Sequence, residues 1–263
     1  MPPLMLKVST GLILSFGLVL TMTGCPSGSS GSAGGGAAAT TKPFAATSLA
    51  LAAAPPSAPV FDPCPSDGTP CRIMPLGDSL TSGTDGQDGY RGSLYTRLKA
   101  LGRPFDFVGS LPGGTAGTGQ EGHPGMHIDL LTQYEGIWLP AAKPHVILLL
   151  MGSNDLDINY LGHVVTFGQV LDACLQLLPN SLIVVSLIPT TTYAPDKAVS
   201  FNAALTDVVK ARIAQGKHVQ LVDGHSALRL RDLGPDGLHP AHSGYVRMAD
   251  VWLTALVPFM RAH

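Results

Sequence analysis

The sequence HVILLLM at residues 145–151 is apolar from its second residue to its last. Such an unbroken apolar run is typical of a β-strand that is buried on both faces. Residues 182–188, LIVVSLI, form a second run of nearly the same kind. Because strands of this type occur mainly in parallel sheets that are covered by helices, the two runs predict an α/β domain.

Further strands and helices alternate around these two runs. Shorter apolar runs at residues 72–76, 105–108 and 219–222 predict three more strands. Apolar residues at helical spacing predict helices near residues 94–101, 128–138, 162–178 and 201–213, and a last helix with Tyr245, Met248, Trp252 and Leu256 on its buried side. Five strands, each followed by a helix, predict a parallel five-stranded sheet covered on both faces.

The charged residues are distributed unevenly along the chain. They make up only 13% of the 263 residues, and residues 1–60 contain just Lys7 and Lys42. Residues 61–263 carry the rest and are long enough for one domain with a sizeable core. The formal net charge is -2, and no basic stripe suggests a nucleic-acid partner.

The N-terminal 60 residues have the composition of a targeting segment and a linker. After Lys7, residues 12–20 read LILSFGLVL, which is too short to span a bilayer but fits the apolar core of a secretory signal peptide. Residues 22–25, MTGC, resemble the lipobox of bacterial lipoproteins, which implies cleavage before Cys25 and acylation of its thiol. Ordinary secretion with cleavage nearby and an uncleaved anchor are the alternatives.

We therefore expect a signal peptide of the lipoprotein type at residues 1–24. Residues 25–60 are rich in Gly, Ala, Ser and Pro and are expected to form a flexible tether. One folded domain then covers residues 61–263. This organisation predicts an exported protein that is either secreted or attached to the bacterial cell envelope, at the outer membrane or cell surface, with a lipid anchor as its only membrane contact.

The remaining cysteines agree with export. Cys64 and Cys71 flank the turn-rich segment PSDGTP, and in an oxidising compartment this spacing predicts a disulfide. Cys174 shares a helical apolar face with Leu171, Leu175 and Leu178. We expect it to be a buried free thiol that packs as a small hydrophobic side chain.

Residues that could take part in catalysis follow four of the predicted strands, at the edge of the sheet where such folds place their sites. Ser79 follows the first strand, Gly109 the second, Asn154 the third, and Asp236 and His239 the fifth. Taken singly, a serine in this position is usually a helix cap, and an Asn-Asp pair is usually a turn. Together they supply a nucleophile, a base, a carboxylate to orient the base, and donors for an oxyanion.

These segments resemble the successive blocks of the GDSL, or SGNH, hydrolases over about residues 70–263. The matching residues are GDSL at 77–80, Gly109, GSND at 152–155 and DGLHP at 236–240. The resemblance implies a flavodoxin-like three-layer α/β/α fold and no cofactor. It also implies that Ser79 is the nucleophile, that His239 is the base with Asp236 as its partner, and that Ser79, Gly109 and Asn154 form the oxyanion hole.

Three longer segments resemble the acetylxylan esterase branch, carbohydrate esterase family three. They are GQDGYRG at 86–92, EGHPG at 121–125 and GPDGLHP at 234–240. This similarity implies deacetylation of a plant polysaccharide, with an acylated carbohydrate or another small ester as the partner of a monomeric enzyme. Arg91 and His123 are weaker candidates for substrate contact, since structural roles are about as well supported.

Several alternatives remain open at this stage. The same blocks occur in lipases, lysophospholipases and thioesterases, and an inactive, anchored glycan-binding protein is a third possibility. The Gly-x-Ser-x-Gly and P-loop signatures are absent, which argues against an ordinary α/β-hydrolase and a nucleotide hydrolase. We expect no metal site, so that His123, His127, His225 and His242 are loop or surface residues, and we expect Asp78 and Asp155 to make supporting hydrogen bonds.

Overall fold

The computed structural model of the protein describes residues 61–117 and 119–261. The predicted signal peptide at 1–24, the tether at 25–60 and the acylation site at Cys25 lie outside the described residues. Within the described residues, no helix combines the length and the apolar character that crossing a membrane requires.

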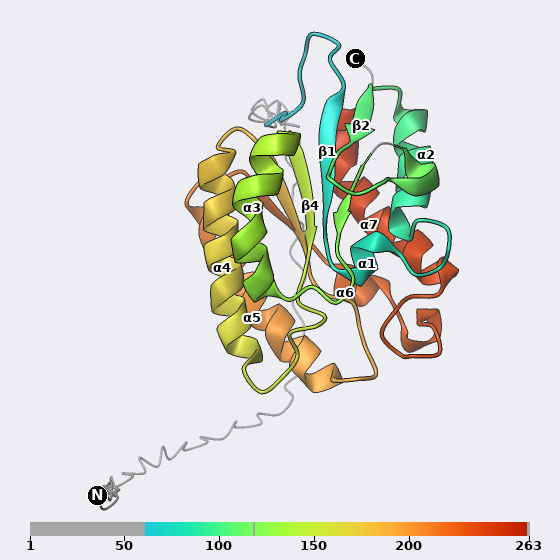
Figure 1. The fold of residues 1–263 in the computed structure, drawn as a ribbon, viewed down its shortest axis with the longest axis vertical. Helices are drawn as coiled ribbons and strands as arrows, with labels where there is room; N and C mark the ends of the chain where they lie inside the picture. The colour runs from blue at the N-terminus through green and yellow to red at the C-terminus, as the bar shows by residue number, and fades with distance from the viewer. Residues whose placement is uncertain (1–60, 118, 262–263) are drawn as a thin grey trace, which may run out of the picture. The chain divides into compact units, whose positions relative to one another are not determined.

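A parallel β-sheet forms the centre of the domain (Figure 1). The strands β1 (Cys71–Gly77), β2 (Phe105–Phe107), β4 (Val146–Leu150), β5 (Leu182–Ser186) and β6 (Val219–Val222) lie in the order β2-β1-β4-β5-β6. Each neighbouring pair is parallel, which confirms the predicted five-stranded sheet. A two-residue strand, β3 (Glu121–Gly122), also runs parallel to the C-terminal end of β1, beside Leu76 and Gly77.

Helices cover both faces of this sheet (Figure 1). On one face, α2 (Tyr90–Leu101) packs against α7 (His242–Met260); on the other, α3 (Ile128–Ala142), α4 (Tyr160–Leu177) and α5 (Pro195–Ala214) pack in that order. The connections contain the short helices α1 (Ser79–Ser82) and α6 (Gly224–Ala227) and the 3-10 turns η1 (Gly114–Ala116) and η2 (Leu230–Asp232). The three layers confirm the predicted α/β/α fold.

The core follows the apolar pattern of the sequence. Every residue of β4 and β5 is buried, as expected for strands covered on both faces. The predicted inner face of α7, consisting of Tyr245, Met248, Trp252 and Leu256, is at most 3% exposed at each position. Cys174 on α4 is free and buried, so it packs as the small hydrophobic side chain that its spacing indicated.

The structure differs from the sequence prediction mainly in short elements and element ends. β3 and α1 have two and four residues, which is too short for a periodic pattern. The helix predicted at 201–213 begins earlier, at Pro195. Proline suits the first turn of a helix, because the N–H that it lacks has no partner inside the helix there.

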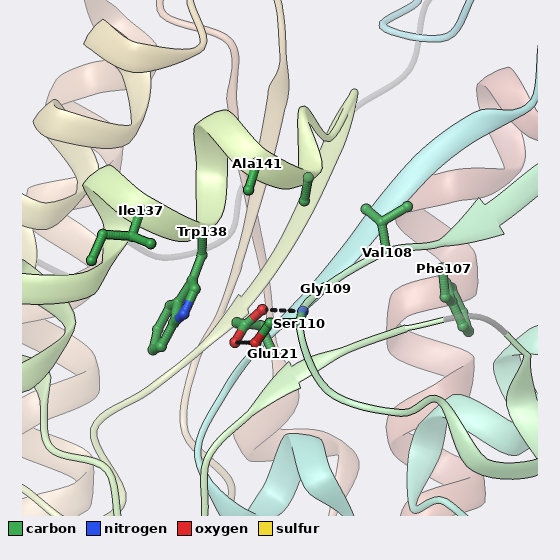
Figure 2. Close-up of a pocket in the computed structure, with 9 residues that line it drawn as sticks. Phe107, Val108, Gly109, Ser110, Glu121, Ile137, Trp138 and Ala141 are labelled. Atoms are coloured by element: carbon green, nitrogen blue, oxygen red, sulfur yellow. Dashed lines mark hydrogen bonds between the residues drawn. The ribbon is translucent and has the colours of Figure 1, made fainter.

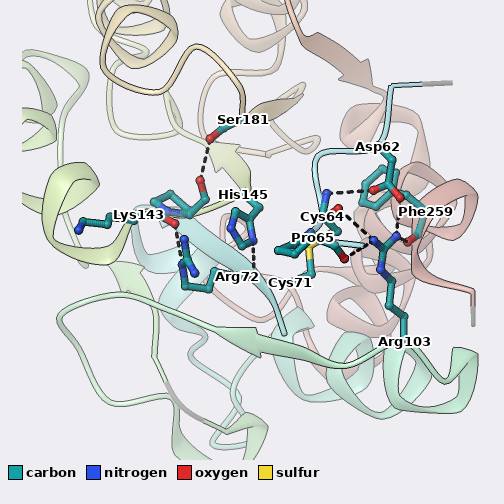
Figure 3. The surroundings of a disulfide bond; sticks show 11 residues. Asp62, Cys64, Pro65, Cys71, Arg72, Arg103, Lys143, His145, Ser181 and Phe259 are labelled. Atoms are coloured by element: carbon teal, nitrogen blue, oxygen red, sulfur yellow. Dashed lines mark hydrogen bonds and ion pairs between the residues drawn. A yellow bond between two sulfur atoms is a disulfide. The ribbon is translucent and has the colours of Figure 1, made fainter. Parts of the chain in front are cut away.

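Cys64 and Cys71 form a disulfide, as the sequence predicts (Figure 3). Cys71 is the first residue of β1 and is fully buried. Arg103 joins this loop to the end of α7, because its guanidinium donates to the carbonyl oxygens of Cys64, at 3.0 Å, and Phe259. The same guanidinium lies 2.6 Å from a carboxylate oxygen of Asp62. The disulfide loop is therefore fastened at the N-terminal edge of the sheet.

Candidate active site

Ser79 is the first residue of α1, directly beyond the C-terminal end of β1. Asp78 caps this short helix, because its Oδ1 accepts a hydrogen bond from the Leu80 N–H at 2.9 Å. The preceding turn needs glycine, since a Cβ on Gly77 would lie 2.2 Å from the Leu150 carbonyl oxygen of β4. The turn thus places Ser79 at the sheet edge, with its N–H among the amides that have no partner inside the helix.

His239 and Asp236 lie beside Ser79, far along the chain from it. Nε2 of His239 is 2.8 Å from Oγ of Ser79, and Nδ1 of His239 is 2.6 Å from Oδ2 of Asp236. The other carboxylate oxygen of Asp236 accepts hydrogen bonds from the backbone N–H groups of Leu238, at 3.0 Å, and His239, at 2.9 Å. In this geometry a histidine can accept a serine proton while a carboxylate fixes its tautomer.

The pKa of Asp236 supports this role of its carboxylate in fixing the His239 tautomer. The hydrogen bond from the His239 ring, followed by those from the Leu238 and His239 N–H groups, lowers the pKa of Asp236 to about 2. The carboxylate is therefore ionised at neutral pH. An ionised Asp236 favours the proton on Nδ1 of His239 and leaves Nε2 as the acceptor that faces Ser79.

The loop after β5 holds the segment that carries His239. The hydroxyls of Thr191 and Thr192 donate to the carbonyl oxygen of Gly237, at 3.1 and 3.2 Å. Gly237 has φ +67°, and a Cβ there would collide with Oγ1 of Thr192. These threonines were not among the predicted site residues, although their position just after the predicted strand at 182–188 was a usable signal.

Gly109 and Asn154 are the other predicted oxyanion donors. A Cβ on Gly109 would lie 2.2 Å from the Gln120 carbonyl oxygen. The segment after β2 and the segment before β3 therefore pass so close to each other that only glycine fits at position 109. The Asn154 amide donates to the Met126 carbonyl oxygen at 2.9 Å and lies 3.5 Å from Oδ2 of Asp78. Met126 therefore fixes the Asn154 amide, whose second N–H makes only the long contact with Asp78.

Two buried carboxyl groups are direct chain neighbours of the candidate residues Ser79 and Asn154. Asp78 and Asp155 are both fully buried. Burial, the largest cause, and the nearby Asp155 carboxylate together raise the pKa of Asp78 to about 7. Burial also raises the pKa of Asp155, which accepts a hydrogen bond from the Ile128 N–H at the start of α3 at 3.1 Å. Both residues thus make the supporting hydrogen bonds that we expected.

Arg91 is buried next to α1. Its side chain is 3% exposed, and its guanidinium donates to the carbonyl oxygens of Thr81 and Ser82, each at 2.9 Å, and of Gly113 at 3.2 Å. These bonds connect α2 with α1 and with the loop after β2. The geometry therefore gives Arg91 a role in positioning α1, and the predicted substrate contact has no support from it.

His123 lies closer to the exposed surface, next to the end of β1. Its N–H donates to the Gly77 carbonyl oxygen at 2.9 Å, and its Nε2 lies 2.7 Å from Oε1 of Glu121. The imidazole stacks on the Trp138 indole, with ring centroids 4.4 Å apart. Its position is therefore compatible with the predicted substrate contact, which the geometry leaves as a prediction.

The other histidines named in the sequence analysis have protein partners. His127 lies 3.3 Å from Asp155, and His242 lies 2.9 Å from Asp85. His225 lies 3.2 Å from the Ile188 carbonyl oxygen. Over residues 61–117 and 119–261, no group of three or more His, Cys, Asp or Glu side chains is placed to hold a metal ion.

The sequence profile of the GDSL-like lipase/acylhydrolase family matches residues 76–247, a segment that runs from the end of β1 into α7 and includes every candidate catalytic residue. The chain belongs to this family. It is therefore a carboxylic ester hydrolase of the GDSL-like, or SGNH, type. The assignment agrees with the GDSL motif at 77–80 and with the order in which the other blocks follow it.

Known relatives of this GDSL-like hydrolase include several esterases. A family 3 carbohydrate esterase of Clostridium thermocellum is 29% identical, with a TM-score of 0.64 over 72% of this chain and 96% of that one. A family 3 carbohydrate esterase of Talaromyces cellulolyticus, 22% identical with a TM-score of 0.65 over 72% and 98% of the two chains, shares the fold. A multidomain esterase of Ruminococcus flavefaciens is 28% identical over 82% of this chain, which spans only 32% of that protein's length.

The GDSL-like domain also has an open cavity of about 560 Å³ next to Gly109. Figure 2 shows Ile137 and Trp138 extending from α3 on one side of it, and Ser110 and Glu121 on the other. Glu121 accepts hydrogen bonds from the Ser110 N–H at 2.6 Å and the Ser110 hydroxyl at 2.7 Å. No sequence pattern predicts this cavity, because its walls come from a helix face and a two-residue strand.

Proposed function

We propose that the chain is a serine esterase that removes short acyl groups, acetyl above all, from a polysaccharide such as xylan. The observation that carries the proposal is the hydrogen-bonded series from Ser79 through His239 to Asp236, at 2.8 and 2.6 Å. Similarity to the family 3 carbohydrate esterase of Clostridium thermocellum supports a sugar ester as substrate.

The proposed reaction proceeds through an acyl-enzyme. Oγ of Ser79 attacks the ester carbonyl carbon and transfers its proton to Nε2 of His239. The N–H groups of Ser79 and Gly109 and the side-chain amide of Asn154 stabilise the oxyanion. The sugar hydroxyl leaves with the proton from His239. A water molecule, deprotonated by His239, then attacks the acyl carbon and releases acetate and free Ser79.

The first test is the hydrolysis of p-nitrophenyl acetate by Ser79→Ala. We expect kcat/KM to fall at least about 10³-fold, because no other group in the site replaces the nucleophile. Ser200→Ala is the matched control, since Ser200 is exposed on α5. Full activity in a folded Ser79→Ala protein would remove Ser79 as the nucleophile.

The second test concerns the substrate. Acetylated xylan, p-nitrophenyl esters of increasing acyl length and a lysophospholipid are compared with the wild-type enzyme. We expect the highest kcat/KM on acetyl esters, with acetate released from xylan. A preference for long acyl chains or for the lysophospholipid would contradict the carbohydrate assignment and favour the lipase alternative.

We also propose that the protein is exported and acylated at Cys25, within the MTGC segment. The Cys64–Cys71 disulfide supports export, because disulfides persist mainly in oxidising compartments. We expect labelled palmitate to be incorporated into the wild-type chain and to be absent from Cys25→Ala. A wild-type chain without label, or equal label in the variant, would contradict acylation.

A further inference from the structure

The loop that carries Asn154 is attached to the start of α3. The Asp155 N–H donates to the Gly152 carbonyl oxygen at 3.0 Å, which closes the turn on which Asn154 lies. The buried carboxylate of Asp155 accepts from the Ile128 N–H at 3.1 Å, and the Asn154 amide donates to the Met126 carbonyl oxygen at 2.9 Å. The position of this candidate oxyanion donor therefore depends on how α3 is fixed relative to the end of β4.

His163 lies in the first turn of α4, which packs beside α3 on the same face of the sheet (Figure 1). Its Nδ1 lies 3.5 Å from a carboxylate oxygen of Asp129, on α3, and 3.8 Å from one of Asp155. Its Nε2 lies 3.4 Å from a carboxylate oxygen of Asp157, in the loop after β4. One imidazole therefore lies among three carboxylates, which come from α3 and from the loop that carries Asn154.

Both ring nitrogens of His163 face carboxylate oxygens. A neutral imidazole has one N–H and one nitrogen lone pair, whereas an imidazolium has an N–H on each nitrogen. Only the charged form can therefore offer a donor to Asp157 and to Asp129 at the same time. In the neutral form a lone pair faces a carboxylate at one of these contacts, and the charge attraction that joins α4 to the other two segments is lost.

The surroundings of His163 favour the imidazolium. Burial lowers the pKa of His163, but the hydrogen bond with Asp157 and the charges of Asp155 and Asp129 outweigh burial, so that the pKa lies above its ordinary value of 6.5. The side chain is only 12% exposed, so water and salt screen its ion pairs incompletely. The contacts that join α4 to the other segments are therefore strongest at and below neutral pH.

Three other titratable groups lie near this cluster and have to be separated from His163 by experiment. His127 is exposed and lies 3.3 Å from Oδ1 of Asp155. Lys197 of α5 donates to a backbone carbonyl oxygen of the loop after β4 at 3.1 Å. The buried Asp78 interacts through its charge with Asp155. His163 is the group whose ring contacts a carboxylate of α3 and two carboxylates of the loop.

We propose that His163 is a positioning residue for the oxyanion hole. As an imidazolium, it holds α3 and the loop after β4 in the arrangement that directs the Asn154 amide at the oxyanion. Loss of its proton loosens this loop and lowers the rate of acyl transfer, without any contact between His163 and the substrate. The inference rests on the proposed function, because it takes Asn154 as an oxyanion donor, and it adds a pH-dependent control of that donor.

The pH dependence of kcat tests this role. Rates on p-nitrophenyl acetate are measured from about pH 5.5 to about pH 9.5 and corrected for hydrolysis without enzyme. We expect kcat of the wild type to fall about tenfold on the alkaline side, because small displacements of a group in the site are costly. KM should stay nearly constant, since the oxyanion forms only in the transition state. A profile without an alkaline fall would overturn the proposal.

Two substitutions of His163 separate its charge from its packing. His163→Arg keeps a positive charge at every pH tested, so it should remove the alkaline fall and keep kcat within about threefold of the wild type. His163→Gln keeps a hydrogen-bonding group without the charge, so kcat should be about tenfold lower at every pH and show no alkaline fall. An alkaline fall that persists in His163→Gln would assign the titration to another group. Equal rates of the two variants would exclude a role of the charge, and either result overturns the proposal.

A double-mutant cycle with Asn154→Ala shows whether His163 acts through the oxyanion donor. In the Asn154→Ala protein, His163→Gln should change kcat by less than about twofold, because the donor that it positions is already absent. Asp172→Asn is the matched control, since it removes a charge from another ion pair of α4, the one with Arg212, and should keep the wild-type pH profile. Additive effects of His163→Gln and Asn154→Ala, or an altered profile in the control, would contradict the positioning role.

The outcomes also distinguish this inference from the proposed function. Full activity in a folded Ser79→Ala protein would remove the proposed mechanism, whatever the effect of His163→Gln. An enzyme that is inactive as Ser79→Ala but keeps the wild-type pH profile as His163→Gln would retain the proposed function and lose this inference.

Discussion

Ser79 keeps its hydroxyl free because a neighbouring residue performs the capping that a serine at a helix start usually provides. The Oδ1 of Asp78 accepts from the Leu80 N–H at 2.9 Å, so Oγ of Ser79 is available to His239 at 2.8 Å. The two carboxylate oxygens of Asp236 likewise have separate partners. Oδ1 accepts from the Leu238 N–H in the local turn, and Oδ2 faces Nδ1 of the His239 imidazole. In both cases the hydrogen bond that stabilises the local turn or helix end is made by an atom outside the Ser79–His239–Asp236 hydrogen bonds.

The buried Asp78 predicts how stability depends on pH. Its folded-state pKa, about 7, lies above its value in an unfolded chain, so the folded state binds the extra proton between about pH 4 and 7. Stability then falls as pH rises through that window. We expect Asp78→Asn, which keeps an acceptor for Leu80, to reduce this fall by at least about 1.4 kcal/mol, the equivalent of one pKa unit. Urea unfolding at pH 4.5 and 7.5 measures it.

Asp67→Asn is the matched control for that experiment. Asp67 is exposed and accepts a hydrogen bond from the Thr69 N–H, and the Thr69 hydrogen bonds lower its pKa. Its contribution to stability is therefore present above the unfolded pKa and changes only below about pH 4. An Asp78→Asn protein with the same pH slope as the wild type would show that Asp78 is ionised throughout this window.

At the scale of elements, α1 depends on α2 for its position. A four-residue helix has no stability of its own in water. Arg91 on α2 donates to the carbonyl oxygens of Thr81 and Ser82, which belong to the last two residues of α1. The same guanidinium also reaches Gly113. The candidate nucleophile Ser79 is thus held in place by a side chain of α2, a longer helix that packs on α7.

This dependence predicts the effect of Arg91→Met. The substitution keeps an apolar side chain of similar length and leaves the buried carbonyl oxygens of Thr81 and Gly113 without a donor. We expect the free energy of unfolding to fall by about 2–4 kcal/mol. We also expect kcat to fall more than KM rises, because α1 carries Ser79.

Arg97→Met, on the same helix but in an exposed ion pair with Asp250, should change stability by less than about 0.5 kcal/mol. Equal effects of the two variants would contradict the positioning role.

The elements also explain which features the sequence could predict. β4 and β5 were predictable because burial on both faces requires unbroken apolar runs, and the α7 face because its spacing repeats over several turns. Ser79, His239 and Asp236 could be chosen as candidates because parallel strands end at one edge of the sheet, and the structure places their side chains within hydrogen-bonding distance. The Glu121–Trp138 cavity was not predictable, since it depends on a two-residue strand meeting a helix face. The structural role of Arg91 depends on which carbonyl groups lie around it, and the sequence carries no signal for that.

At the scale of the whole domain, the disulfide and the candidate active site lie at opposite ends of β1. The disulfide and Arg103 secure the chain where β1 begins at Cys71. Ser79 lies just beyond the other end, after Gly77. Seven residues of strand span about 23 Å, so the two ends have no atoms in contact. Stability and catalysis should therefore respond separately to changes at the disulfide.

The double variant Cys64→Ser/Cys71→Ser tests that separation. Loss of a cross-link that closes so short a loop is expected to lower the free energy of unfolding by about 2–3 kcal/mol, because the unfolded chain gains conformational freedom. At a temperature where both proteins remain folded, kcat/KM on p-nitrophenyl acetate should agree within about twofold, since the Ser79–His239–Asp236 geometry lies at the far end of β1. Urea unfolding and initial rates, measured on the same preparations, provide the two quantities. Dithiothreitol should destabilise the wild type by a similar amount and have no effect on the double variant. A drop in kcat/KM in the folded double variant would show that the disulfide loop influences the active-site edge through β1.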